Sequence, residues 1–206
     1  MIPLAEGFDV IQEEAEEDFM RLGGVGDEEL SDSLIDTSRS RVPWLMVNLV
    51  TAFMAASVIG LFEGTIQEIV ALAVLMPIVA GMGGNAGSQT MTVTVRALAT
   101  RNLDIHNAWR VIRREAGVGL INGLFFGIVV GVVSGFWFED ANLGFVISAA
   151  MIINMFAAAV AGIAIPMVLD RTGADPAVSS AVFVTAITDI AGFFSFLGLA
   201  TWWLLR

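Results

Sequence analysis

The chain has 206 residues, of which 56% are apolar and only 15% are charged, whereas soluble domains average about 45–50% apolar and 25% charged residues. A mean hydropathy of +0.79 indicates that lipid is the surrounding solvent. Cysteine is absent, which excludes disulfides, thiolate metal sites and cysteine nucleophiles. Because His106 is also the single histidine, the chain lacks the groups for most acid–base relays, and we expect no enzyme.

The net charge of −11 is concentrated at the N-terminus. Residues 1–40 hold twelve acidic residues and two arginines, while all later residues hold nine acidic residues and eight arginines. Nucleic acid is disfavoured as a partner, because phosphate backbones need clustered cations. Phe8 to Leu22 is expected to form a short acidic helix, followed by a polar linker up to Ser40. We therefore divide the chain into an acidic connecting segment, 1–40, and a membrane domain, 41–206.

Five runs are long and apolar enough to cross a bilayer as helices, which takes roughly 20 residues each. They lie at approximately 42–62, 68–95, 115–138, 143–169 and 177–205. Arginines precede the first run and occupy the links after the second and fourth, whereas the links after the first and third carry acids and no arginine. The positive-inside bias then predicts a cytoplasmic N-terminus and an external C-terminus. The expected fold is an all-α, multi-pass protein of the cell (inner) membrane with five transmembrane helices.

The fifth run contains the one acidic residue expected well inside a span, Asp189. It follows Pro176 by thirteen residues, which places it about 20 Å along the helix, near the middle of the membrane. A charge at that depth costs at least about 2.5–3.5 kcal/mol, and no arginine lies at this depth in any run. We therefore expect a mobile cation to neutralise Asp189. A hydrogen bond to a neighbouring helix is the alternative. Small or hydroxyl-bearing residues share or flank its face: Ala181, Thr185, Thr188, Gly192 and Ser195.

The second run has a proline and four glycines at membrane depth, between Pro77 and Gly87. Such a sequence lets a helix bend or lets two backbones approach closely. Asn85 and Gln89 follow one helical face, with Ser88 beside them. Amide, hydroxyl and carboxylate oxygens are the donors that suit magnesium or calcium. The alternative is that these residues serve helix packing alone.

The third run has a glycine at every fourth position from Gly119 to Gly135. Such a ladder forms a groove that admits another helix at short distance. We interpret it as a packing surface, within or between subunits. Asn122 in the third run and Asn154 in the fourth are expected to hydrogen-bond between helices.

Two motifs resemble the MgtE magnesium channel family. The first is Pro77 to Thr90 (PIVAGMGGNAGSQT), followed by RALATR at 96–101. The second is Asp175-Pro176-Ala177, with Thr188-Asp189 further along the fifth run. The acidic segment and the residues Arg41 to Trp44 are also similar to the family's connecting helix and the entry into its first span. The resemblance therefore covers essentially the whole chain.

The resemblance implies a homodimer of five-span subunits around a central pore that is lined mainly by the second and fifth helices. It implies that Asp189 binds Mg²⁺ at the pore centre, with help from the backbone carbonyl of Thr185, and that Asp175 lies at the cytoplasmic end. Asn85 and Gln89 match the second-helix motif, while Ser88 and Ala181 stand where some relatives carry asparagine. With Thr188 and Gly192, these residues make up the expected pore lining.

Family members usually also carry cytoplasmic regulatory domains, including paired CBS modules, so the chain is expected to correspond to the membrane portion alone. The expected function is a channel that conducts hydrated Mg²⁺ into the cell between paired Asp189 carboxylates, one from each subunit. One alternative is a carrier that exchanges the cation for protons or sodium, with Asp189 binding proton and metal in turn. Another is a non-transporting membrane scaffold built on the glycine ladder.

Overall fold

The computed structural model describes residues 33–100, 103, 105–173 and 176–205. The acidic helix predicted at Phe8 to Leu22 lies outside the described residues, and so does Asp175. The described ranges contain six helices and no strand. Five of these helices are long and apolar enough to cross a membrane, which confirms the predicted all-α fold with five spans.

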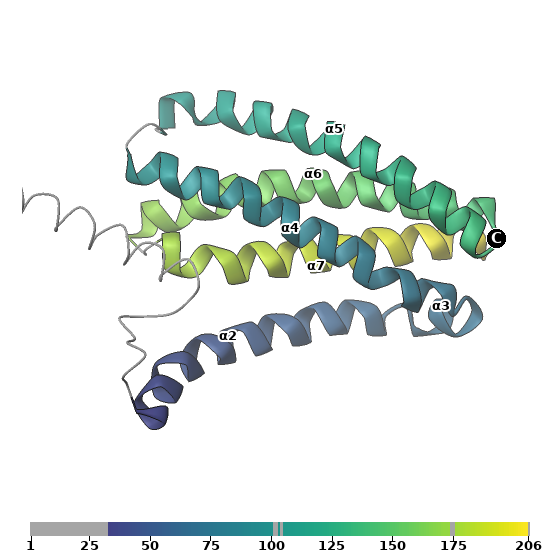
Figure 1. The fold of residues 1–206 in the computed structure, drawn as a ribbon, viewed down its shortest axis with the longest axis horizontal. Helices are drawn as coiled ribbons and strands as arrows, with labels where there is room; N and C mark the ends of the chain where they lie inside the picture. The colour runs from purple at the N-terminus through teal and green to yellow at the C-terminus, as the bar shows by residue number, and fades with distance from the viewer. Residues whose placement is uncertain (1–32, 101–102, 104, 174–175, 206) are drawn as a thin grey trace, which may run out of the picture.

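The five long helices are joined by short connections and run in alternate directions (Figure 1). They are α2 (Leu34–Gly60), α4 (Ala71–Ala99), α5 (Ile105–Trp137), α6 (Ala141–Thr172) and α7 (Pro176–Leu204), with the short α3 (Glu63–Glu68) between α2 and α4. Several helices extend beyond the predicted spans, and α5 begins ten residues before position 115. The reason is that apolar runs mark the part of a helix inside hydrocarbon, whereas the helix itself continues into the polar interface.

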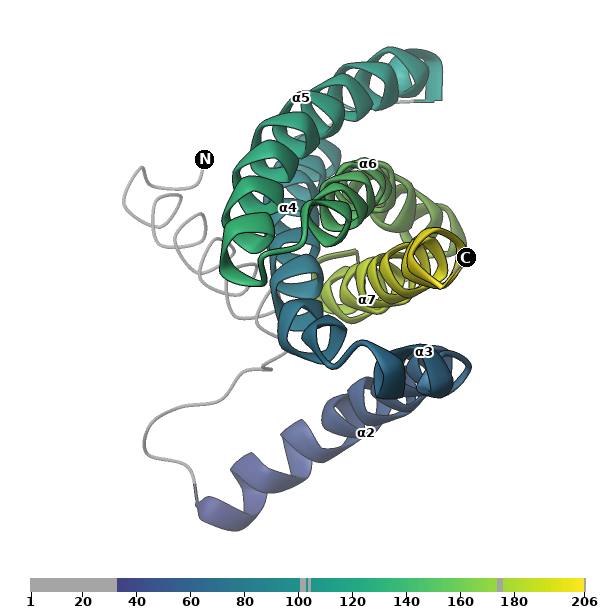
Figure 2. The ribbon, with the colours of Figure 1, turned by 90° about the vertical axis from the view of Figure 1, so that its right-hand side faces the viewer.

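The helix α6 forms the centre of the bundle and contacts α4, α5 and α7. Figure 2 looks along the bundle and shows α5 and α2 at opposite margins. Half of the most apolar window of α6 is buried, a larger share than in any other of the five candidate spans. The main core consists of large apolar side chains from α4, α6 and α7, among them Leu72, Leu75, Ile147, Met151 and Phe196.

The glycine ladder of α5 packs against α6, as the sequence predicts. A Cβ atom at Gly119 would lie 2.8 Å from the carbonyl oxygen of Met155, and one at Gly131 would lie 2.7 Å from that of Gly144. These neighbours are backbone atoms, which cannot turn aside. The hydroxyl of Ser148 on α6 also donates to the carbonyl oxygen of Gly127 at 2.8 Å. The ladder is therefore a packing surface within one subunit.

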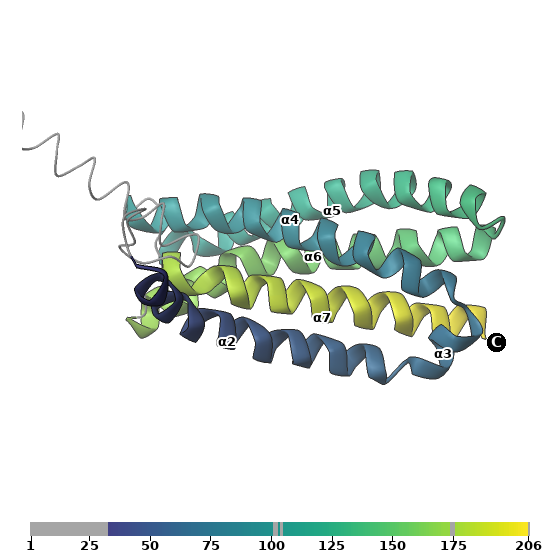
Figure 3. The same cartoon turned by 60° about the horizontal axis from the view of Figure 1, so that its bottom comes forward.

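By contrast, α2 is attached to the bundle by few contacts. Its principal neighbour is α7, beside which it lies at the margin of the bundle (Figure 3). Only 6% of its most apolar window is buried, and Ala55 is its one buried residue. The following helix α3 is joined to α7 by a 2.8 Å hydrogen bond between the hydroxyls of Thr65 and Thr201. Most of α2 therefore presents apolar side chains outward.

Candidate cation-binding site

Asp189 lies near the middle of α7, ten residues into the candidate span Ser179–Leu204. Its side chain is half-buried, and it makes no hydrogen bond or ion pair with any residue that the structure describes. Among those residues there is also no group of three or more His, Cys, Asp or Glu side chains that could hold a metal ion. Asp189 thus stands without a second acidic side chain beside it in the part of the chain that the structure describes.

Thr185 precedes Asp189 by one helical turn, and its side chain is exposed. The carbonyl oxygen of Thr185, which the family resemblance assigns to the ion, accepts a hydrogen bond from Thr188 Oγ1 at 2.9 Å. Ala181, a turn earlier, is half-buried. Thr185 is therefore the one exposed residue among the predicted α7 site residues that the structure describes, and Asp189 and Ala181 are half-buried.

The other two predicted pore-lining residues of α7 lie inside the subunit. Thr188 is fully buried, and its methyl carbon would lie 3.4 Å from a Cβ placed on Gly87 of α4. Gly192 is also buried, and a Cβ there would lie 2.7 Å from Asn154 Nδ2 on α6. Both residues let α7 approach its neighbours closely and are separated from the exposed face.

The helix α4 has two distinct glycine faces. Gly83 and Gly87 are buried against side chains of α6 and α7, and a Cβ at Gly162 of α6 would lie 2.9 Å from the carbonyl oxygen of Gly87, which agrees with the predicted close approach of backbones. Gly81 and Gly84 have no atom within 4 Å of an added Cβ. The predicted polar residues follow this open side and are exposed: Asn85, Ser88 and Gln89. The helix remains continuous through Pro77.

Asn154 joins three helices at the centre of the bundle, and it is fully buried. Its Nδ2 donates to the carbonyl oxygen of Val79 on α4 at 2.8 Å, which confirms the predicted hydrogen bond between helices for Asn154. The same prediction is wrong for Asn122, whose side chain makes no hydrogen bond with the described residues. Its side chain fills the space beside Gly83 of α4 and Gly192 of α7. Its Oδ1 atom has no hydrogen-bond partner within the described ranges. Asn154 thus sets the spacing of the two helices that carry the predicted site.

The antiparallel contacts of α4 and α7 bring two predicted site residues to similar depth. At one level along the two helices, Gly87 of α4 contacts Thr188 of α7. About one turn away, the side chain of Asn154 lies between Gly83 of α4 and Gly192 of α7. Asn85 lies between these two contacts on α4, and Asp189 lies between them on α7. The amide of Asn85 and the carboxylate of Asp189 therefore lie at a similar depth in the membrane.

Glu115 of α5 is a further half-buried acid, which the sequence did not mark as a candidate site residue. It directly follows Arg114 and stands at the start of the apolar run of α5, ten residues after the helix begins at Ile105. With Gln89 and Asn122 it lines a cavity of about 140 Å³ between α4, α5 and α6. The spacing of Glu115, Gly119 and Asn122, which places all three on one helical face, was the available signal.

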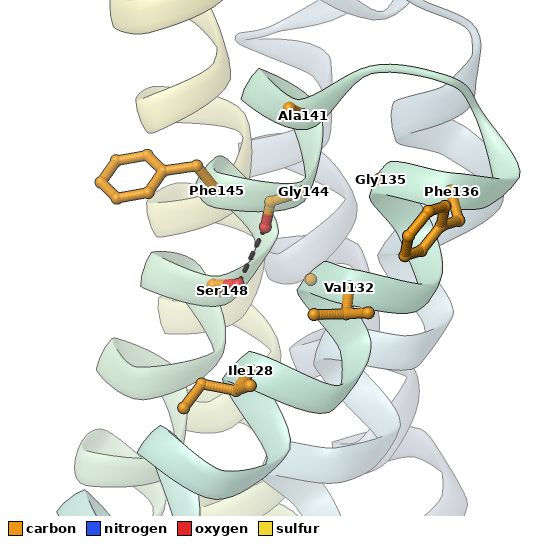
Figure 4. A pocket seen from close by; sticks show the side chains of 9 residues that line it. Ile128, Val132, Gly135, Phe136, Ala141, Gly144, Phe145 and Ser148 are labelled. Atoms are coloured by element: carbon orange, nitrogen blue, oxygen red, sulfur yellow. Dashed lines mark hydrogen bonds between the residues drawn. The ribbon is translucent and has the colours of Figure 1, made fainter.

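A larger groove of about 430 Å³ lies where α5 ends and α6 begins (Figure 4). Its walls are mostly apolar, with Ile128, Val132 and Phe136 on α5 and Phe145 on α6. The hydroxyl of Ser148 points into this region, but it donates to backbone carbonyls at 2.8 Å. The groove contains no carboxylate and is no candidate for binding a cation.

Five helices long and apolar enough to cross a membrane, with a carboxylate, an amide and hydroxyl groups along their length, define the class, a multi-pass helical membrane protein. Residues 76–199 match the model of the MgtE family, which is described as divalent cation transporters. The chain belongs to this family.

Three curated relatives are each named magnesium transporter MgtE. The Enterococcus faecalis protein is 37% identical over 94% of this chain and 43% of its own length. The Bacillus subtilis protein is 31% identical over 94% of the chain and 43% of its length. The Thermus thermophilus protein is 34% identical over 97% and 45% respectively. The chain thus spans less than half the length of these relatives.

Proposed function

We propose that this chain forms a homodimeric channel that conducts hydrated Mg²⁺ past paired Asp189 carboxylates. The observation that carries the proposal is that Asp189 lies at mid-depth without an ion pair or hydrogen bond in the described part of the chain. A two-fold axis beside this face would bring the same residue from each subunit together. Two carboxylates balance the charge of one divalent cation, which removes the cost of leaving either charge alone in lipid. The names of the relatives support magnesium as the cation.

The open side of α4 supports the position of this pore. Exposed amide and hydroxyl groups at Asn85 and Ser88 need hydrogen-bond partners that hydrocarbon does not offer. A water-filled pore, or a second subunit packed on Gly81 and Gly84, would supply those partners. In this proposal Gln89 also lines the pore. Thr188 and Gly192 do not reach the pore but set the distance between α4 and α7 from within the bundle. Ala181 and Asp175 continue the pathway toward the start of α7.

The geometry of Thr185 favours recognition of the hydrated ion. Mg²⁺ gives up its water reluctantly and prefers six ligands in near-ideal octahedral geometry. Ion-bound water molecules would donate to Asp189 and to the carbonyl oxygen of Thr185. That carbonyl already accepts from Thr188 Oγ1, so binding of an ion must compete with this hydroxyl. Selectivity would then depend on pore width and on hydrogen bonds to the hydration shell, as in other filters.

Flux of Mg²⁺ into proteoliposomes tests the proposal. Asp189→Asn keeps the shape of the side chain and removes its charge, so it should abolish flux while the oligomeric state in detergent stays unchanged. Asp170→Asn is the matched control, because Asp170 is an exposed acid in the last turn of α6. Unimpaired flux in the Asp189 variant would remove this residue from the pathway. A monomer that conducts would exclude the paired site.

The same vesicles distinguish a channel from a carrier. Single-channel currents and flux that follows the membrane potential alone support the channel. Flux that collapses an imposed proton or sodium gradient with a fixed stoichiometry would support the exchanging carrier, in which Asp189 binds proton and metal in turn. Absence of any flux, with thermal stability independent of Mg²⁺, would support a scaffold.

A further inference from the structure

The beginning of α5 presents a cluster of three arginines and one tryptophan away from the bundle. Trp109, Arg110, Arg113 and Arg114 are all exposed, and at about 100° per residue they lie within an arc of about 140° on one helical face. The opposite face packs against the ends of α4 and α6, through Ala108, Val111 and Ile112. We call these four residues the arginine cluster. Because α5 is at the margin of the bundle (Figure 2), no other described helix covers it.

The four side chains of the arginine cluster line a cavity of about 560 Å³. None of its arginines forms an ion pair with a residue in the described ranges. Guanidinium groups are planar and bind phosphate through paired hydrogen bonds. The cavity therefore has the chemistry of a phosphate site, with three positive charges and an indole ring at its edge.

The depth of the cluster places it at a membrane surface. The three arginines lie between the start of α5 at Ile105 and the apolar run that begins near position 115, where a membrane helix passes from the polar interface into hydrocarbon. Further along the same face the exposed residues are all apolar, at Leu120, Ile121 and Leu124. Arg114 and Leu120 are about 9 Å apart along the helix axis. One continuous face thus changes from guanidinium groups to aliphatic groups over the distance that separates headgroups from acyl chains.

We propose that the arginine cluster binds the phosphate of an anionic phospholipid, whose acyl chains lie along Leu120, Ile121 and Leu124. The charge of the site selects anionic over zwitterionic lipids, since basic pockets on helix ends attract negatively charged headgroups. The indole of Trp109 is suited to the interfacial region. An inorganic phosphate ion would satisfy the guanidinium groups but would leave the apolar half of the face without a partner. This site is separate from the proposed ion pathway and does not depend on it.

Lipid-dependent thermal stability of the whole chain in phosphatidylcholine micelles tests the proposal. Added phosphatidylglycerol should raise the melting temperature with a saturable midpoint, and equal amounts of extra phosphatidylcholine or inorganic phosphate should not. Each interfacial arginine is worth about 1 kcal/mol toward anionic lipid, so Arg113→Gln should raise the midpoint roughly fivefold. The triple variant Arg110→Gln, Arg113→Gln, Arg114→Gln should raise it about 100-fold. Arg171→Gln is the control, because Arg171 is exposed in the last turn of α6 at the same end of the bundle.

Three results would overturn the proposal. An unchanged midpoint in both the single and the triple variant would show that the lipid binds elsewhere. Stabilisation by inorganic phosphate at a similar midpoint would identify a soluble anion as the ligand. If the variants lower the melting temperature equally with and without phosphatidylglycerol, the arginines pair with acidic residues of the protein itself.

Discussion

The buried contact between Gly83 and Asn154 predicts that a single methyl group added at position 83 lowers the stability of the bundle. A Cβ at Gly83 would lie 2.8 Å from Cγ and 3.0 Å from Oδ1 of Asn154, closer than real side chains approach. Asn154 cannot easily turn aside, because it is fully buried and its Nδ2 is bonded to Val79 at 2.8 Å. Gly83→Ala should therefore destabilise the bundle by forcing α4 and α6 apart or by breaking that hydrogen bond.

The expected magnitude follows from two opposing effects. Overpacking of a well-packed interior costs about 1–3 kcal/mol, while alanine gains roughly 0.5–1 kcal/mol over glycine within a helix. Gly117→Ala on α5 is the matched control, since no atom lies within 4 Å of a Cβ there. Gly117→Ala should show only the gain in stability that alanine has over glycine within a helix. The difference between the two variants then isolates a steric cost of about 1–3 kcal/mol for Gly83→Ala.

A double-mutant cycle identifies the cause, with unfolding free energies measured by reversible denaturation in mixed micelles. Asn154→Ala alone should lose the hydrogen bond to Val79, worth about 0.6–1.7 kcal/mol between membrane helices, together with the packing of the side chain. In that background Gly83→Ala has space for its methyl group, so its steric cost should disappear. If Gly83→Ala costs the same in both backgrounds, Asn154 is not the residue that limits the approach of α4.

Two further predictions concern backbone contacts. Gly131→Ala should cost about 1–3 kcal/mol of stability, because its Cβ would lie 2.7 Å from the carbonyl oxygen of Gly144; a melting temperature equal to that of Gly117→Ala would contradict the packing described. Thr188→Val keeps the buried shape and frees the carbonyl of Thr185 from one hydrogen bond. Since such a bond is worth about 0.5–1.5 kcal/mol, the Mg²⁺ concentration for half-maximal flux should fall about two- to tenfold, and an unchanged value would show that this carbonyl takes no part in binding.

The five spans were predictable because the bilayer imposes a minimum apolar length on each helix. The sequence was less informative about helices, or parts of helices, that lie outside the hydrocarbon and need no long apolar run. The short helix Glu63–Glu68 carries acids at both ends and has no long apolar run. The beginning of α5 holds arginines on its outer face and apolar residues on its inner face. Hydropathy averaged over a window of residues therefore does not reveal this part of the helix.

The candidate site was predictable in its position along the chain but not in the direction of each side chain. Asp189 was identifiable because a charge in lipid is costly. Helical spacing places Thr185 and Thr188 near its face, yet only Thr185 is exposed, because contacts with α4 decide which side of α7 is covered. Glu115 was overlooked since the apolar run that marks its helix starts at that residue.

The sparse attachment of α2 has a mechanical consequence. A pull or a rotation applied at Leu34 would be transmitted along a continuous helix of 27 residues that has few contacts with the rest of the bundle. The first part it meets is α7, the helix that carries Asp189. A displacement that starts outside the bilayer would thus cross a single interface before it reached the acidic residue, and the tightly interlocked pair of α5 and α6 would stay in place as a fixed frame.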